Sequence, residues 1–169
     1  RTNYRVVSGK IIGKTLIKTR NTITLDAGEF DSVKIGMPVI TDKGLVGKIV
    51  ATSANYSIAQ ILLNKDLKVS VKDQRSRVDG IISWDGEGKV LMKNVSKSAD
   101  AIIGDVVITS EYSNSFPPGI PVGFITTDGT KDNLFKNIEV ECFVNFDTIE
   151  EVFVLKYLSD DERKELEKK

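Results

Sequence analysis

The feature that most constrains this chain is its richness in β-branched residues. It contains 18 Val, 18 Ile and 12 Thr, so 48 of its 169 residues branch at Cβ, whereas Leu and Ala together number only 17. β-Branched side chains lose χ1 freedom in a helix and pack well on a pleated sheet. The composition therefore predicts an all-β fold.

Short strand-like runs separated by turn residues recur along the sequence. The segments Asp42–Gly44 and Asp85–Gly88 lie between such runs and are typical of β-hairpin turns, because Gly adopts positive φ without steric cost. About a dozen strands are expected, in small barrels or sandwiches. No apolar run approaches the roughly 18 residues of a membrane span, and the chain begins at Arg1 without a visible signal peptide. We expect it to be a soluble part of a longer protein.

Charge is balanced over the whole chain but not along it. The 24 basic and 24 acidic side chains cancel, yet residues 1–20 carry six basic groups and no acid, while residues 139–162 carry eight acids against Lys156 alone. Either the two ends form separate solvated faces or they are neighbours, because opposite charges across paired strands stabilise a sheet by roughly 0.2–1 kcal/mol per pair. We predict that the first and last strands belong to one barrel or sandwich.

The lack of His and the single Cys exclude several chemistries. A Ser-His-Asp or Cys-His nucleophile, an imidazole-ligated zinc site and an intramolecular disulfide cannot be built from this sequence. Cys142 alternates with Val140 and Val144 and is interpreted as a small buried hydrophobe. The zero net charge opposes a strongly basic nucleic-acid binder, and no phosphate-binding glycine motif occurs. We expect no catalytic residue, no metal and no cofactor.

An internal repeat covers two expected hairpins. Residues 35–41 (IGMPVIT) match residues 103–109 (IGDVVIT), and residues 44–49 (GLVGKI) match residues 119–125 (GIPVGFI) with one inserted Pro. The two halves are separated by two residues in the first copy and by nine in the second. The repeat predicts two similarly built β subdomains; a chance similarity between Gly-containing hairpins is the alternative.

Two apolar features are candidates for contact with a partner. The run Val152–Tyr157 is apolar on both faces of an expected strand, so it is either buried on both sides or half of it meets a partner. The loop Ser113–Gly119 places an aromatic ring beside two prolines, where the ring either plugs a barrel end or anchors a partner. Because buried aromatic anchors dominate many interfaces, we predict that four residues contribute to a partner surface: Phe116, Phe153, Leu155 and Tyr157.

The last residues of the chain differ from the rest. Residues 159–169 consist largely of good helix formers, with acids before bases as the helix dipole favours. Leu166 is their only large apolar side chain. We therefore expect a short, exposed helical tail.

Several motifs carry a family resemblance over about Tyr4 to Tyr157. They are ITLDAG at 23–28, VKIGMPV at 33–39, GLVG at 44–47, GDVVITS at 104–110 and FPPGIPVG at 116–123. Together they resemble the extracytoplasmic β domain of the MreC family of rod shape-determining proteins. Glu111 departs from the pattern, which commonly has Gly after Thr-Ser.

The resemblance implies two small six-stranded β barrels or sandwiches, one of them similar to a chymotrypsin-type barrel without its catalytic triad. The chain is expected to start in the first barrel, make the second, and return to finish the first. We therefore assign residues 1–50 with 129–158 to a discontinuous first barrel, 51–128 to the second, and 159–169 to the tail.

The resemblance also implies a function. Family members are non-enzymatic scaffolds of the bacterial cell-wall elongation complex, which organise peptidoglycan synthesis and maintain cell shape through protein–protein contacts and self-association. The implied partners are a class B penicillin-binding transpeptidase, MreD, RodZ, the glycosyltransferase RodA and the actin-like MreB. The implied location is the extracytoplasmic face of the cytoplasmic membrane, with a single-pass anchor outside this chain. A protease-like barrel and a nucleic-acid-binding barrel stay open as alternatives.

Overall fold

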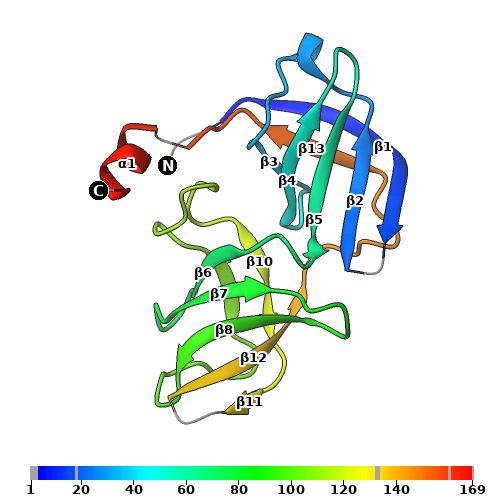
Figure 1. Cartoon of the computed structure of the whole chain (residues 1–169). Coiled ribbons are helices and arrows are strands. Elements are labelled where there is room, and N and C mark those ends of the chain that lie inside the picture. Colours follow the sequence, from blue (N-terminus) through cyan, green and yellow to red (C-terminus); the bar gives the residue numbers. More distant parts are fainter. Residues whose placement is uncertain (1–3, 18, 132–133, 160, 169) are drawn as a thin grey trace.

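The computed structural model describes residues 4–17, 19–131, 134–159 and 161–168, and it consists almost entirely of antiparallel strands (Figure 1). Two groups of strands form two barrels, which confirms the predicted all-β fold. The strands are β1 (Val6–Ile17), β2 (Arg20–Leu25), β3 (Pro38–Ile40), β4 (Leu45–Thr52), β5 (Ser57–Asn64), β6 (Val69–Asp73), β7 (Asp79–Ser83), β8 (Val90–Ser96), β9 (Val106–Thr109), β10 (Pro121–Ile125), β11 (Thr130–Lys131), β12 (Phe135–Cys142) and β13 (Glu151–Leu155).

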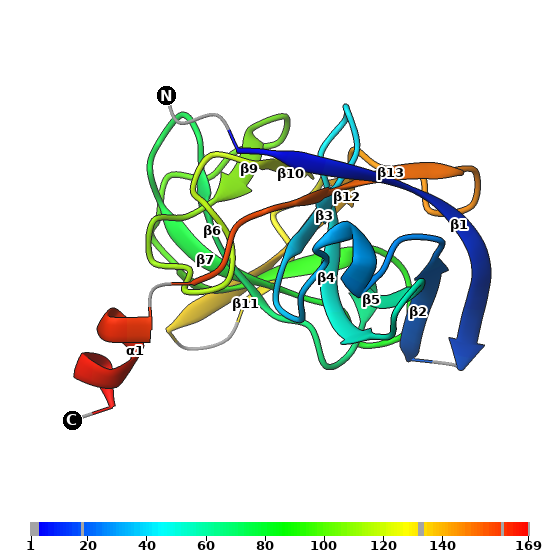
Figure 2. The same cartoon turned by 90° about the horizontal axis from the view of Figure 1, so that it is seen from above.

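The first barrel is a closed ring in the order β1-β13-β3-β4-β5-β2. Its closure joins the two ends of the chain, because β1 pairs with β13 from Val6 opposite Leu155 to Lys10 opposite Glu151. Figure 2 shows these two strands side by side. The prediction that the first and last strands share a barrel is confirmed, and Lys10 opposite Glu151 is one position where the basic start faces the acidic end.

The second barrel contains β10, β9, β6, β7, β8 and β12 in ring order. Pairing of β10 with β12, from Gly123 opposite Cys142 to Ile125 opposite Val140, closes the ring. β11 is a short addition that pairs with the first residues of β12, before the part that meets β10.

The boundaries between the barrels differ from the predicted ones. Residues 51–64 were assigned to the second barrel, yet β5 pairs with β4 and β2 of the first. Residues 129–142 were assigned to the first barrel, yet β12 pairs with β8 and β10 of the second. The first difference has a local cause: a tight turn, in which Ser53 N–H donates to Tyr56 O at 2.9 Å, folds β5 directly back onto β4.

The two rings have the same strand order. Read from β3, the first barrel runs β3-β4-β5-β2-β1-β13, and read from β9, the second runs β9-β10-β12-β8-β7-β6. Every strand of the first barrel thus has a counterpart in the second, and β13 corresponds to β6. Because β13 comes last in the first barrel whereas β6 comes first in the second, the barrels are related by a circular permutation.

The internal repeat occupies equivalent positions in the two rings, as predicted. Gly36 and Gly104 have φ of 97° and 95°, a conformation that glycine adopts readily. Their N–H groups donate to the carbonyl oxygens of Ile49 and Ile125 at 2.9 and 2.8 Å. The repeat therefore reflects one hairpin built twice, as β3–β4 and as β9–β10.

The two barrels are held together by apolar packing. Each has its own buried interior, and the interior of the second barrel extends to Leu45 and Leu62 of the first. These two side chains, from β4 and β5, are 0% and 1% exposed. Burial of large aliphatic side chains stabilises by about 1.5–3 kcal/mol each, so this contact fixes how the barrels are placed.

The tail is helical, as predicted, and contains the one α-helix among the described residues, α1 (Asp161–Glu167). Its Leu166 is 71% exposed. Asn114 Nδ2 donates to Glu167 Oε1 at 3.1 Å, so the helix touches the loop between β9 and β10.

Close backbone approach at Gly47 of β4 gives a test of the hairpin. A Cβ at Gly47 would overlap the carbonyl oxygen of Gln60 in β5. We predict that Gly47→Ala lowers the free energy of unfolding by about 1–3 kcal/mol, because β4 and β5 must move apart. Gly13→Ala is the control, since its Cβ would lie 3.5 Å from Thr24 Cβ, an ordinary contact. Urea unfolding measures the free energy of unfolding of both variants. Equal losses of stability would contradict the close approach of β4 to β5 at Gly47.

Candidate functional site

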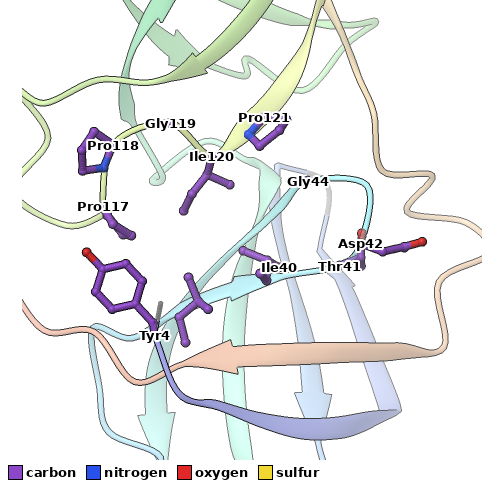
Figure 3. Close-up of a pocket in the computed structure, with 11 residues that line it drawn as sticks. Tyr4, Ile40, Thr41, Asp42, Gly44, Pro117, Pro118, Gly119, Ile120 and Pro121 are labelled. Atoms are coloured by element: carbon purple, nitrogen blue, oxygen red, sulfur yellow. The ribbon is translucent and has the colours of Figure 1, made fainter. Parts of the chain in front are cut away.

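A groove of about 780 Å³ opens where the two barrels meet (Figure 3). One wall comes from the β3–β4 hairpin of the first barrel, and the other comes from residues 117–121, which lead into β10 of the second. Tyr4 and Leu155, which precede and end the paired strands β1 and β13, line the groove as well. Segments of both barrels and of both ends of the chain therefore meet at this groove.

The groove lies where the two copies of the repeated hairpin touch. A Cβ at Gly44, in the β3–β4 turn, would overlap the carbonyl oxygen of Pro121 at the start of β10. Gly44 also has φ of 156°, which L residues rarely adopt. A glycine is therefore required for the two hairpins to approach this closely.

The wall formed by residues 117–121 is fixed by a buried hydroxyl. Thr109 is fully buried, and its Oγ1 donates to Pro117 O at 2.7 Å and accepts the N–H of Ile120 at 2.8 Å. Phe116, 1% exposed, packs in the interior of the second barrel just before Pro117. The prolines and this anchoring make the wall rigid before any partner arrives.

Two tyrosines join the ends of the chain beside the groove. The rings of Tyr4 and Tyr157 lie 5.4 Å apart between centroids at 84°, an edge-to-face contact. Tyr4 is 37% exposed, and Figure 3 shows its ring directed toward Pro117, with Ile120 pointing into the same space. An aromatic and aliphatic surface is thus presented on a rigid frame.

The structure brings together two of the four residues predicted to contact a partner. Leu155 lines the groove but is only 6% exposed, and Tyr157 contacts Tyr4 beside it. Phe153 shares their face of β13, opposite Ile40 and Ser8 in the neighbouring strands, and is partly buried. Phe116 is a correction: it plugs the second barrel, so it supports the groove wall from inside and offers no side-chain surface to a partner.

Sequence reasoning missed other parts of the groove. Tyr4, Ile40 and Ile120 line it, and none of them was singled out. Ile40 and Ile120 belong to the two copies of the repeat, so the repeat could have indicated that the hairpins meet. Tyr4 gave no signal of its own, because its position depends on the pairing of the chain ends.

The groove and its surroundings carry little reactive chemistry. Asp42 is the one charged residue among those that line the groove. Within the described ranges, no three His, Cys, Asp or Glu side chains are placed to hold a metal ion. Burial, followed by the charge of Glu141, raises the pKa of Cys142 to about 12, so its thiol stays protonated at neutral pH.

An ion pair stands at the start of the loop between β9 and β10. Lys72 of β6 is 6% exposed, and its Nζ contacts the carboxylate of Glu111. This cation holds the pKa of Glu111 below its usual value. Glu111 thus neutralises a buried lysine at the position where the sequence departs from the family pattern.

Comparison with known proteins identifies the family. Residues 11–156 match the family described as rod shape-determining protein MreC, barrel core. This chain belongs to the MreC family. The cell shape-determining protein MreC of Listeria monocytogenes is 31% identical over 128 residues, which cover 73% of this chain and 43% of the relative. The chain spans about two fifths of the length of such curated MreC proteins.

Solved MreC structures share the fold. The MreC structure from Listeria monocytogenes aligns with a TM-score of 0.82 at 25% identity, covering 94% of this chain and 79% of that one. The MreC chain in a complex with the penicillin-binding protein PBP2 from Helicobacter pylori aligns with a TM-score of 0.68 at 16% identity, covering 90% of this chain and 100% of that one. No helix in the described part of the chain has the length and apolar character to cross a membrane.

The buried hydroxyl of Thr109 gives a test of the groove wall. We predict that Thr109→Val lowers the free energy of unfolding by about 1–3 kcal/mol, because Pro117 O and the N–H of Ile120 lose their buried partner. The equivalent residue of the first copy, Thr41, accepts only the exposed N–H of Lys43 at 3.1 Å. Thr41→Val is therefore the control, with an expected loss below about 0.5 kcal/mol. Urea unfolding that gave similar losses for both variants would contradict this role.

Proposed function

We propose that this chain is a non-enzymatic scaffold domain of the bacterial cell-wall elongation complex, and that it binds a penicillin-binding transpeptidase through the groove between its barrels. The observation that carries the proposal is the groove built from both barrels, with the Tyr4–Tyr157 pair at its edge, in a chain of the MreC family. Support for the partner comes from the Helicobacter pylori relative, whose structure is a complex with PBP2.

The groove has the physical properties of a protein-binding surface. Tyr4 and Ile120, with the largely buried Leu155, supply apolar area, and Asp42 and the tyrosine hydroxyl supply a small polar rim. Interfaces are dominated by a few such aromatic and aliphatic anchors surrounded by polar groups. Because the prolines and Thr109 hold one wall in place, little conformational entropy is lost on binding.

The outward face of β13 extends this surface. Phe153 lies two residues before Leu155 and therefore points to the same side of the strand. It forms a row with Leu155, which is only 6% exposed, and with Tyr157, which lies beyond the end of β13. A partner seated in the groove would cover this row as well.

The remaining parts of the proposal follow from the family. MreD, RodZ, RodA and MreB are proposed members of the same complex, and self-association of the chain is proposed as well. The domain would act on the extracytoplasmic side of the cytoplasmic membrane, where transpeptidases cross-link peptidoglycan, and a membrane anchor would be supplied by sequence beyond these 169 residues.

The two alternatives have less support. A protease-like barrel would need a nucleophile and a base, but the chain has no His and burial keeps the Cys142 thiol protonated. A nucleic-acid-binding barrel would need a positive groove with stacking aromatics. Asp42 is the charged residue that lines the groove, so its electrostatics oppose a phosphate backbone.

The two tyrosines test the proposed interface. We predict that Tyr4→Ala and Tyr157→Ala each weaken binding of the purified extracytoplasmic region of the same organism's penicillin-binding transpeptidase by about 30-fold, the effect of losing one aromatic anchor. Tyr56→Ala is the matched control, because Tyr56 is 51% exposed in the β4–β5 turn, outside the groove lining. Calorimetric titration gives the affinities, and thermal melting shows that each variant folds. Unchanged affinity in both groove variants would reject the site.

A further inference from the structure

One arginine and two aspartates tie the turn after β6 to the loop before β9. Arg75 Nε and Nη2 donate to the Asp105 carboxylate at 2.9 and 3.0 Å, and Nη1 and Nη2 donate to Asp100 at 3.0 and 2.8 Å. Asp105 also accepts the N–H of Ile102 at 3.1 Å. Two bidentate pairs on one guanidinium are strong, geometrically specific contacts.

A third carboxyl group, that of Asp73, lies beneath this pair. It is fully buried, and its Oδ1 accepts the N–H groups of Arg75 and Ser76 at 2.9 and 3.2 Å. Its Oδ2 is buried and has no hydrogen-bond donor among the described residues. The Asp73 side chain also lies within hydrogen-bonding reach of Asp105. Two adjacent carboxylates in a dry site cannot both be ionised at low cost.

Among the described residues, no neighbouring positive charge is available to balance an ionised Asp73 carboxylate. The guanidinium of Arg75 already serves Asp105 and Asp100. Burial, followed by the hydrogen bond with Asp105, raises the pKa of Asp73, whereas Arg75 holds the pKa of Asp105 well below its usual range. The charged groups near the cluster are Arg75 and Arg77 of the turn, Asp100 and Asp105 of the loop, and Lys136 of β12.

The first barrel provides an internal comparison. Asp73 lies opposite Val107 of β9, and Val154 lies opposite Val39 of β3, the equivalent residue of the repeat. Val154, like Asp73, is 0% exposed. The shared strand pairing thus accepts an apolar residue at this position. In the second barrel Asp73 Oδ1 also holds the turn between β6 and β7, so the buried Oδ2 is the part of the side chain that this structural role leaves unexplained.

Asp105, like Asp73, is replaced by an apolar residue in the first barrel. Asp105 corresponds to Met37 in the repeat, and each accepts an N–H from the residue three positions earlier: Met37 Sδ from Lys34 at 3.4 Å and Asp105 Oδ2 from Ile102 at 3.1 Å. The positions that hold Val154 and Met37 in the first barrel therefore hold Asp73 and Asp105 in the second. Only the second version can respond to protons.

We infer that Asp73 carries a proton and donates it in a hydrogen bond to Asp105, and that this acid–carboxylate pair is a pH-sensitive latch on the loop before β9. The proton satisfies the otherwise orphaned Oδ2 and removes the repulsion between the carboxyl groups. The latched loop carries Ile102 and Ile103, which are 53% and 65% exposed. Loss of the proton would loosen the position of this apolar loop tip.

The direction of the pH dependence follows from the raised pKa of Asp73. A group that is harder to ionise in the folded state than in the unfolded state favours folding most at low pH, and this contribution is lost as pH rises through the folded-state pKa. Asp105 and Asp100, whose pKa values are lowered, act in the opposite sense and lose their contribution as pH falls. Stability should therefore decline on both sides, and Asp73 is responsible for the decline above about pH 4.

The experiment uses the whole chain and its Asp73→Asn variant. Asn has the shape of a protonated Asp and can donate permanently to Asp105. We expect the melting temperature of Asp73→Asn to exceed that of the parent by about 2–4 °C or more at pH 8, and the difference to vanish near pH 3. Asp128→Asn, which changes an exposed acid of the same barrel, should show no such pH-dependent gain. Equal melting temperatures of Asp73→Asn and the parent across the range would overturn the proposal.

Two measurements do not depend on the stability of a variant. In the parent chain, the carbon-13 shift of the Asp73 carboxyl should titrate above the ordinary aspartate range, and titration at the ordinary aspartate value would overturn the assignment. Hydrogen exchange tests the latch itself, because the N–H of Ile102 donates to Asp105. Its protection factor should fall as pH rises through the Asp73 titration in the parent and stay constant in Asp73→Asn; parallel behaviour would show that no latch exists.

Discussion

The antiparallel pairing of β1 with β13 is the contact on which the rest of the structure depends. It closes the first barrel with the two ends of the chain, across the whole second barrel in sequence. Closing such a long segment adds little entropic cost over a shorter one, since the cost grows only with the logarithm of length. The same pairing sets Tyr4 against Tyr157 and turns Leu155 toward the second barrel. The chain ends therefore complete the groove that the two hairpins form.

The equivalence of the two rings explains why the groove lies where it does. β3–β4 and β9–β10 are one hairpin built twice, and their turns meet at Gly44 and Pro121. Because the two hairpins are otherwise alike, the differences between them determine the shape of the groove. Here the difference is the connection: two residues after Thr41 in the first copy and nine after Thr109 in the second. The longer connection, stiffened by its prolines, forms one wall.

Much of this architecture could be predicted from the sequence, and the failures have physical causes. The β-branched composition, the repeat and the opposite charges of the chain ends correctly indicated two barrels with the first one discontinuous. The barrel boundaries were misplaced because the patterns of the largely buried β5 and the alternating β12 suit either barrel, and only their pairing partners decide. Phe116 was misread because an aromatic ring beside prolines looks alike whether it points inward or outward. The Asp73–Asp105 contact gave no signal, because the two residues are far apart in sequence and meet only when β6 pairs with β9.

What the two barrels share and what they do not share separates fold from function. Gly36 and Gly104, and the paired hydrogen bonds that surround them, recur because the hairpin requires them. The proline wall, the pair of Lys72 with Glu111 and the buried acid at Asp73 occur only in the second barrel, at positions where the first has a short turn and Val154. The hairpin that the two barrels share forms in the first barrel without these features. The features specific to one copy, which include one wall of the groove and the contacts that hold the loop before β9, are therefore where recognition of a partner and its regulation should reside.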